Sequence, residues 1–412
     1  MKTWRLPALI MFVLLAEQAS AIEWVATWGA APAPPSAAIG PFPGTPSFTN
    51  QTIRQVVRIS AGGERVRVRF TNEYGTKPLA IGAARIALAD ENGNVVPGTE
   101  RALTFSGKTR VWVPARAPML SDAVELPVKA LSSLSISIYL PEETGPCTCH
   151  ATALQTAFVS DTGDFTAERF EAKQKIQSRA FLSGVEVLAP AKASAIAVLG
   201  DSISDGMGST ADTNRRWPDV LAARLASRDR KMAWGVVNLG ISGNRLLDDG
   251  AGESALARFD RDVLALPGVD HVIIFLGVND LGMSFGKPTG PMAEFFKTLR
   301  PANPATADAM IAGYRQLIDR AHAKGLKVFG ATLAPYEGAM YYSADGESVR
   351  QAINTWMRTG KAFDAVLDFD AVFRDPAHAT QMAEALHSGD HLHGSDAGYE
   401  KVAASIDLSL FK

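Results

Sequence analysis

A short apolar run that stops at a polar tripeptide constrains the fold of this 412-residue chain most. Ala195–Leu199 has the continuous hydrophobicity of a strand buried on both faces. Gly200-Asp201-Ser202 follows at once, so a serine stands at the carboxyl end of that strand. Open α/β sheets bind ligands at this edge, and a serine there can act as a nucleophile. Ser202 could instead be a helix N-cap, because serine and aspartate favour that position.

The chain after this point alternates between strands and helices. This pattern predicts βαβ units and a parallel sheet whose carboxyl ends share one edge, in a domain spanning 189–412. The predicted strands are Ala195–Leu199, Gly235–Leu239, Val272–Leu276, Leu326–Leu333 and Ala365–Phe369, and the predicted helices are Trp217–Ser227, Ala255–Leu266, Asp308–Lys324, Val349–Thr359 and Ser395–Leu410, with a long loop over Lys287–Thr306.

The chain before this point has the pattern of an antiparallel β protein. Short strands separated by turn residues predict an all-β sandwich domain over 22–188, joined to the next domain by a linker around Leu182–Ser194. In the segment 65–70, apolar residues alternate with Arg65, Arg67 and Arg69. The arginine row could bind an anionic or sugar ligand, but we interpret it as the solvated face of a sheet.

The first residues have the features of a secretory signal. Lys2 and Arg5 precede the apolar run Leu6–Ala16, and Ala19-Ser20-Ala21 follows. This pattern predicts a signal peptide over 1–21, cleaved after Ala21, and a secreted or periplasmic protein. The apolar run is shorter than the roughly 20 residues that span a bilayer, so no membrane span is expected. The net charge of −2 shows no basic surplus, which argues against a nucleic-acid partner.

The chain has two cysteines, Cys147 and Cys149. In an oxidising compartment they could bond to each other, although the ring would be small, and their redox state stays open. The tract could also suggest a metal site with His150, but no fourth ligand lies nearby. We therefore predict no metal and no cofactor.

Polar residues follow several of the predicted strands. Ser202, Gly243 and Asn279 follow three of them, and Asp390 and His393 follow the last. Acyl transfer needs a nucleophile, a base, a group that orients the base, and donors for the oxyanion. Ser202 fits the first role, His393 the second and Asp390 the third. The backbone N–H groups of Ser202 and Gly243, with the Asn279 amide, could stabilise the oxyanion.

Each of these residues also has a simpler explanation. Gly243 could be a turn glycine, and Asn279 could cap a turn. His391 competes with His393 as the base. Asp205 is expected to fix the nucleophile turn through backbone hydrogen bonds. The remaining histidines have no evident carboxylate partner beside a strand end and are interpreted as structural or solvent-facing: His150, His271, His322, His378 and His387.

Four segments together resemble the sequence blocks of the SGNH (GDSL-type) hydrolases. They are Gly200-Asp201-Ser202-Ile203, Asn238–Gly243, Gly277-Val278-Asn279-Asp280 and Asp390-His391-Leu392-His393, and the resemblance spans Ser194–Lys412. It implies a flavodoxin-like three-layer α/β/α sandwich and metal-free ester hydrolysis. It also implies a triad of Ser202, His393 and Asp390 with Gly243 and Asn279 as oxyanion donors. The runs Ser209–Leu221 and Leu239–Asp262 are similar to a secreted subfamily with an N-terminal β-domain that includes acetylxylan-esterase-like proteins.

The expected function is a secreted serine carboxylic-ester hydrolase that forms an acyl-enzyme with short-chain esters, acetyl above all. The substrate would be a small molecule or a polysaccharide ester, and the oligomeric state stays open. A lipase-like or aryl esterase is the alternative, since Phe285, Phe295 and Phe296 could wall an apolar acyl pocket, although such aromatics usually belong to a core. A carbohydrate-binding protein on a disabled hydrolase scaffold is the alternative from another class. A nucleotide-binding domain is disfavoured, because Ala211 replaces the third glycine of its motif.

Overall fold

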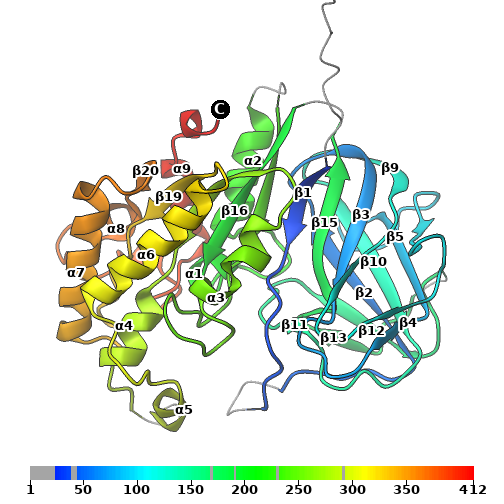
Figure 1. Cartoon of the computed structure of the whole chain (residues 1–412), viewed down its shortest axis with the longest axis horizontal. Helices are drawn as coiled ribbons and strands as arrows, with labels where there is room; N and C mark the ends of the chain where they lie inside the picture. The colour runs from blue at the N-terminus through cyan, green and yellow to red at the C-terminus, as the bar shows by residue number, and fades with distance from the viewer. Residues whose placement is uncertain (1–23, 39–43, 168–169, 190–191, 229–231, 290–292) are drawn as a thin grey trace, which may run out of the picture.

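The computed structural model describes residues 24–38, 44–167, 170–189, 192–228, 232–289 and 293–412. The predicted signal peptide lies outside these residues. Figure 1 shows two regions side by side, which we call the β region (β1–β15) and the α/β region (β16 to the C-terminus). The fold class predicted from the sequence is confirmed: an all-β region precedes a parallel sheet covered by helices.

The β region consists of two antiparallel sheets and two short strand pairs. One sheet has the order β1-β15-β3-β8, with β9 also on β3, and the other has the order β13-β12-β2-β10-β5-β6; β4 pairs with β7 and β11 with β14. The strands are β1 (Trp24–Gly29), β2 (Gln51–Arg58), β3 (Gly63–Thr71), β4 (Leu79–Ile81), β5 (Ala83–Leu88), β6 (Arg101–Ala102), β7 (Val111–Val113), β8 (Pro118–Leu120), β9 (Val124–Val128), β10 (Ser133–Leu140), β11 (Cys149–His150), β12 (Ala157–Thr162), β13 (Gln174–Ile176), β14 (Arg179–Ala180) and β15 (Leu182–Leu188).

The arginine row on β3 is less solvated than its alternation suggests. Arg67 donates to Glu186 at 2.5 Å and lies over the Trp24 ring. Arg69 lines a cavity together with Arg261 and other residues of the α/β region. Arg67 and Arg69 are partly exposed, so the row lies on the more solvated face of β3 as predicted, but pairing within the sheet and contact with the second region reduce its exposure.

The α/β region is built on a five-stranded parallel sheet. Its strands are β16 (Ala193–Gly200), β17 (Ala233–Asn238), β18 (Val269–Phe275), β19 (Lys327–Ala331) and β20 (Ala365–Leu367). Their order is β17-β16-β18-β19-β20. This is the flavodoxin-like 2-1-3-4-5 order, in which the chain reverses direction beside the first strand and opens a crevice at the carboxyl edge.

Helices cover both faces of this sheet. They are α1 (Ser202–Asp205), α2 (Trp217–Ser227), α3 (Ala255–Phe259), α4 (Val278–Phe285), α5 (Ala293–Thr298), α6 (Ala307–His322), α7 (Ala344–Thr359), α8 (Phe369–Phe373) and α9 (Asp396–Ser405), with a π turn at Asp260–Leu264 and 3₁₀ turns at Glu384–Leu386 and Leu408–Leu410. Successive residues of β16 point to opposite faces. Ala197 packs in the core that contains Leu317 of α6, and Val198 packs in the core that contains Leu221 of α2. Of the helices among the described residues, none has the length and apolarity to cross a membrane.

Several predicted boundaries need correction. Leu182–Leu188, placed in the linker, is strand β15, because its Val185 and Val187 are fully buried between β1 and β3. The loop over Lys287–Thr306 contains α5. The helix predicted over Ala255–Leu266 changes to a π turn at Asp260.

The two regions contact each other closely beside β1 and β17. The Ser60 hydroxyl donates to the Thr27 carbonyl at 2.5 Å and accepts from the Val236 N–H at 2.7 Å. A Cβ at Gly235 would lie 2.0 Å from the Ala26 carbonyl oxygen, so only glycine permits this approach. The β region thus packs directly against β17 of the parallel sheet.

Candidate active site

The short helix α1 presents Ser202 at the carboxyl end of β16. The Asp201 carboxylate accepts from the Ile203 N–H at 3.0 Å and caps the helix. Ser202 is therefore the first helical residue and not the N-cap, which removes the simpler explanation of this serine. Its hydroxyl remains available for another partner.

His393 and Asp390 meet Ser202 from the loop before α9. His393 Nε2 lies 2.8 Å from Ser202 Oγ, and His393 Nδ1 lies 2.5 Å from Asp390 Oδ2. The structure thus brings together three residues spread over almost 200 positions of the chain. An imidazole between a hydroxyl and a carboxylate can accept the hydroxyl proton and pass it on.

Asp390 is held as a carboxylate by its own turn. Its Oδ1 accepts from the N–H groups of Leu392 at 3.0 Å and His393 at 2.9 Å. Burial raises the pKa of Asp390, but the hydrogen bonds from the His393 ring and these two N–H groups outweigh burial and hold that pKa well below its usual range. The carboxylate is therefore charged wherever the imidazole needs a partner.

His391 does not compete with His393. Its ring stacks on the His387 ring at a centroid distance of 4.3 Å, and its backbone has a φ of +60°. No described residue bonds to its Nδ1. The backbone turn at His391 separates it from the hydroxyl that His393 reaches.

The loop after β17 brings Gly243 to the same edge. Gly243 has a φ of +80°, which L side chains rarely adopt. Within the described part of the chain, the N–H groups of Ser202 and Gly243 donate to no other group. Both donors are thus free to bind an oxygen atom from a ligand.

Asn279, in the first turn of α4, is tied to this loop. Its Nδ2 donates to the Asn244 carbonyl at 3.1 Å, and its Oδ1 accepts from the Tyr341 hydroxyl at 3.2 Å. These two bonds orient the amide and leave its second N–H without a partner among the residues that the structure describes. Gly277, with a φ of +137°, makes the sharp turn that starts α4 directly after β18.

Asp280 fixes the far end of the same loop. Its carboxylate accepts from the N–H of Leu246 at 2.8 Å and of Leu247 at 3.0 Å. Burial raises the pKa of Asp280 to about 7, against the opposing effect of these hydrogen bonds. Burial likewise raises the pKa of Asp201 to about 7. Two protonatable carboxyl groups therefore lie beneath the site.

Arg258 is a site-building residue that sequence reasoning missed. Its side chain is fully buried and donates to the Gly200 carbonyl at 3.1 Å, the Leu239 carbonyl at 2.8 Å and Asn244 Oδ1 at 3.0 Å. It therefore joins the ends of β16 and β17 to the loop that carries Gly243. A helical arginine carries no local signal for this role.

His150 and Asp205 form a contact that the sequence analysis did not predict. His150 Nε2 lies 2.9 Å from Asp205 Oδ1, and both side chains are buried. The prediction that His150 lacks a carboxylate partner near a strand end is therefore wrong. Asp205 also does not act on its own turn as expected, because its Oδ2 accepts from the Ser242 N–H and hydroxyl. The two partners lie in different regions, so no local pattern links them.

Other candidates from the sequence are placed as follows. Cys147 and Cys149 form a disulfide. No group of three or more His, Cys, Asp or Glu that could hold a metal occurs among the described residues. Phe296 is buried and packs on the Tyr341 ring at 5.9 Å, while Phe285 packs against the core. The side chain of Phe295 lies outside the described residues.

Comparison with known proteins assigns the α/β region. Residues 198–401 match the family described as GDSL-like Lipase/Acylhydrolase. No curated protein sequence matches the chain.

Solved structures with a similar fold include three enzymes, each compared over 52% of this chain. The acetylxylan esterase Axe2 from Geobacillus stearothermophilus is 22% identical, with 93% of its chain covered and a TM-score of 0.38. A lipase/acylhydrolase from Enterococcus faecalis is 19% identical, with 92% covered and a TM-score of 0.38. The alpha/beta hydrolase LAE5 from the metagenome of Lake Arreo is 22% identical, with 94% covered and a TM-score of 0.37.

Proposed function

We propose that Ser202 is the nucleophile of this serine ester hydrolase and forms an acyl-enzyme. The match of residues 198–401 to the GDSL-like lipase/acylhydrolase family supports this chemistry. The observation that carries this proposal is the unbroken line of contacts from Ser202 Oγ through the His393 ring to Asp390. The same line supports assignment of His393 as general base and Asp390 as its orienting carboxylate.

The first half of the reaction forms the acyl-enzyme. Ser202 Oγ attacks the ester carbonyl carbon while His393 Nε2 takes the hydroxyl proton. The carbonyl oxygen becomes an oxyanion and accepts from the N–H groups of Ser202 and Gly243 and from Asn279 Nδ2. The C–O bond to the alcohol then breaks, and the proton on His393 goes to the departing alkoxide.

The second half releases the acid. A water molecule gives a proton to His393 Nε2 and attacks the acyl carbon, which forms a second oxyanion on the same donors. The bond to Ser202 Oγ breaks, and the His393 proton returns to that oxygen. Throughout, the Asp390 carboxylate accepts from His393 Nδ1 and stabilises the imidazolium.

Short acyl groups, acetyl above all, are the substrates we propose, with a carbohydrate as a suitable alcohol. The Asp390 side chain is 45% exposed, so the triad reaches the surface, and a bulky alcohol can approach it. Phe296, which could have walled a pocket for a long acyl chain, is instead covered in the core. These features favour an open, shallow site over a lipase-like tunnel.

We further propose that the chain is exported after removal of residues 1–21. The remainder would divide into a β domain over 22–188 and a catalytic domain over 189–412. The Cys147–Cys149 disulfide supports an oxidising compartment. The change from antiparallel to parallel pairing between β15 and β16 supports the division.

The direct test is Ser202→Ala, assayed with p-nitrophenyl acetate. Hydrolysis should fall to background while the melting temperature stays near that of the natural protein, since among the described residues the hydroxyl bonds only to the His393 ring. Retained turnover would exclude Ser202 as the nucleophile. A series of acyl chain lengths, run beside acetate release from acetylated xylan, should show the highest kcat/KM for acetyl esters. A maximum at eight carbons or more would favour the lipase-like alternative.

A further inference from the structure

Asp205 connects the two segments that would perform the chemistry. It is the last residue of α1, whose first residue is Ser202. Its Oδ2 accepts from the Ser242 hydroxyl at 2.8 Å and from the Ser242 N–H at 3.2 Å. Because Ser242 directly precedes Gly243, one carboxylate fixes the spacing between the nucleophile and an oxyanion donor.

His150 holds this carboxylate from the β region. Its Nε2 contacts Asp205 Oδ1 at 2.9 Å and the Thr152 carbonyl at 3.2 Å, while its Nδ1 contacts the Ala31 carbonyl at 3.0 Å. Each ring nitrogen thus faces oxygen acceptors. Both nitrogens donate together only in the imidazolium form, so the surroundings favour a charged ring.

The charge balance of the pair agrees with this geometry. Burial lowers the pKa of His150, but the Asp205 carboxylate and the hydrogen bonds to it and to the Ala31 and Thr152 carbonyls raise that pKa above its ordinary value overall. His150 and Asp205 line a cavity together with Arg216, which interacts electrostatically with Asp205 but hydrogen-bonds to Asp219 at 2.5 Å. Of the described residues, His150 is thus the one ionisable base within hydrogen-bond distance of the Asp205 carboxylate.

The backbone on both sides of His150 is fixed within the β region. Cys149, the preceding residue, is bonded to Cys147, and its carbonyl accepts from the Ala33 N–H at 2.9 Å. His150 itself pairs with Arg179 across β11 and β14. The ring is therefore presented to Asp205 by a rigid support and not by a free loop.

We propose that His150 is a positioning residue for the reaction at Ser202, acting through Asp205 and Ser242 on the oxyanion loop. This inference rests on the proposed function. It makes the β region part of the catalytic apparatus, because its strand β11 supplies the side chain that sets the distance between nucleophile and oxyanion donors.

The test uses His150→Ala, His150→Gln, Asp205→Asn and the double variant His150→Ala/Asp205→Asn in the full-length protein. His150→Ala should lower kcat on p-nitrophenyl acetate by about 10- to 100-fold with KM changed less than twofold, since displaced catalytic groups lose rate and not ground-state binding. His150→Gln keeps one donor for Asp205 and should recover part of the loss. The double variant should lose no more than the larger single loss, because both residues act through one contact.

His322→Gln is the matched control. His322 contacts Asp364 at 2.8 Å, but the pair is partly exposed and lies at the amino ends of β19 and β20, away from the site. Its kcat should equal that of the natural protein. All assays are run below the melting temperature of each variant, and if His150→Ala does not fold, His150→Gln and Asp205→Asn carry the comparison.

The outcomes separate the two proposals. Loss of activity in Ser202→Ala, with natural kcat in His150→Gln and Asp205→Asn, would overturn the positioning role and leave the esterase proposal intact. Losses that multiply in the double variant would also overturn it. Full activity in Ser202→Ala would overturn the proposed function itself.

Discussion

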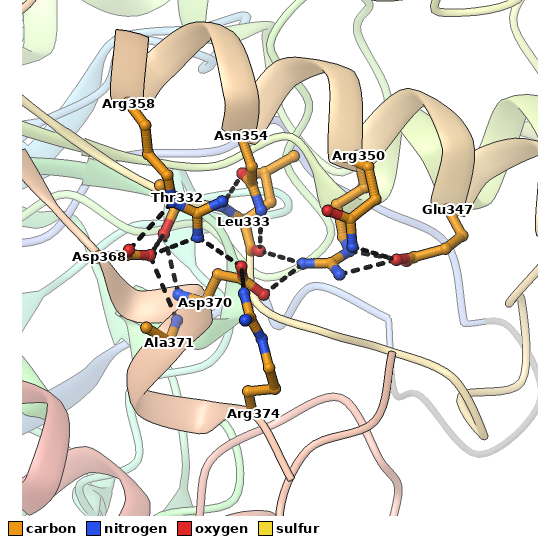
Figure 2. A network of polar contacts seen from close by, with 11 residues as sticks. Thr332, Leu333, Glu347, Arg350, Asn354, Arg358, Asp368, Asp370, Ala371 and Arg374 are labelled. Carbon is orange, nitrogen blue, oxygen red and sulfur yellow. Dashed lines mark hydrogen bonds and ion pairs between the residues drawn. The ribbon is translucent and has the colours of Figure 1, made fainter. Parts of the chain in front are cut away.

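Two polar networks lie at the carboxyl edge of the parallel sheet and differ in what they leave unsatisfied. One is centred on Arg350 of α7, which bonds Glu347 at 2.7 Å, Asp370 at 2.8 Å and the Leu333 carbonyl at 2.7 Å (Figure 2). The other runs from Asp390 through His393 to the Ser202 hydroxyl. In both networks, a carboxylate that follows a strand contacts cationic or ionisable side chains.

The Arg350 network is closed at its carboxylates: both oxygens of Glu347 and both of Asp370 accept from arginine donors, although the Arg374 Nε has no partner among the described residues. Arg358 and Arg374 meet Asp370 from the other side, and Asp370 is fully buried (Figure 2). The network around Ser202 ends instead on a hydroxyl and on N–H groups that have no partner in the part of the chain that the structure describes. A closed network stabilises the junction of α7 and α8 with the sheet, whereas an open one can bind and polarise a ligand. The same residue types therefore support structure in one place and chemistry in the other.

The largest effect on the open network should come from Asp390→Asn. The neutral asparagine amide cannot stabilise the His393 imidazolium that forms during the reaction, and it does not hold the ring in the required tautomer. The kcat should therefore fall by about 10⁴-fold. The melting temperature should change little, because Asp390 is nearly half exposed. Steady-state kinetics with p-nitrophenyl acetate check this, and a loss below tenfold would remove Asp390 from the triad.

The closed network should respond in the opposite way. Arg350→Leu removes the cation from the buried Glu347, which keeps only the Gln351 amide at 2.7 Å, and from one oxygen of Asp370; this should lower the free energy of unfolding by about 3–5 kcal/mol. Arg358→Ala, whose side chain is 30% exposed, should cost about 1 kcal/mol. Urea unfolding measures both, and kcat of the folded variants should not change. A loss of kcat without a loss of stability in Arg350→Leu would contradict the division between the networks.

Asn279→Ala tests one of the free donors. Removing an oxyanion donor should lower kcat by about 10²–10³-fold with little change in KM. Asn279→Ala also leaves a cavity beside Tyr341. Asn279→Asp is therefore measured as well, because aspartate keeps the size of the side chain but replaces the N–H donor with an acceptor. If both variants keep the natural kcat, Asn279 does not contact the oxyanion.

Asp280 should make stability depend on pH. Its folded pKa of about 7 lies above the ordinary value of 3.8, so between these values the folded state holds a proton that the unfolded state has released. The free energy of unfolding should therefore fall as pH rises from about 4 to 7, by a few kcal/mol at most. Asp280→Asn should show a smaller fall, measured by urea unfolding at several pH values. Equal slopes in both proteins would mean that Asp280 is not protonated in the fold.

The sequence predicted the architecture because each layer leaves a local pattern. Ala195–Leu199 is apolar at every position since both faces of β16 are covered, and the alternation in β3 follows its one-sided burial. It also predicted which residues meet at Ser202, because parallel strands place their carboxyl ends together; the roles of these residues remain predictions.

What the sequence did not predict depends on contacts between distant segments. The contact of His150 with Asp205 and the junction made by Arg258 arise from how two regions and three strand ends pack. Packing of this kind follows from shape and burial over the whole molecule, and neither residue stands in a distinctive local pattern.

The most direct measurement is covalent labelling with a fluorophosphonate, followed by mass spectrometry of the peptides. Ser202 Oγ should attack phosphorus and release fluoride, giving one adduct on the peptide that contains Ser202. His393→Ala should label far more slowly, because the base that takes the hydroxyl proton is absent. An enzyme that hydrolyses acetyl esters yet is labelled elsewhere, or not at all, would contradict the account.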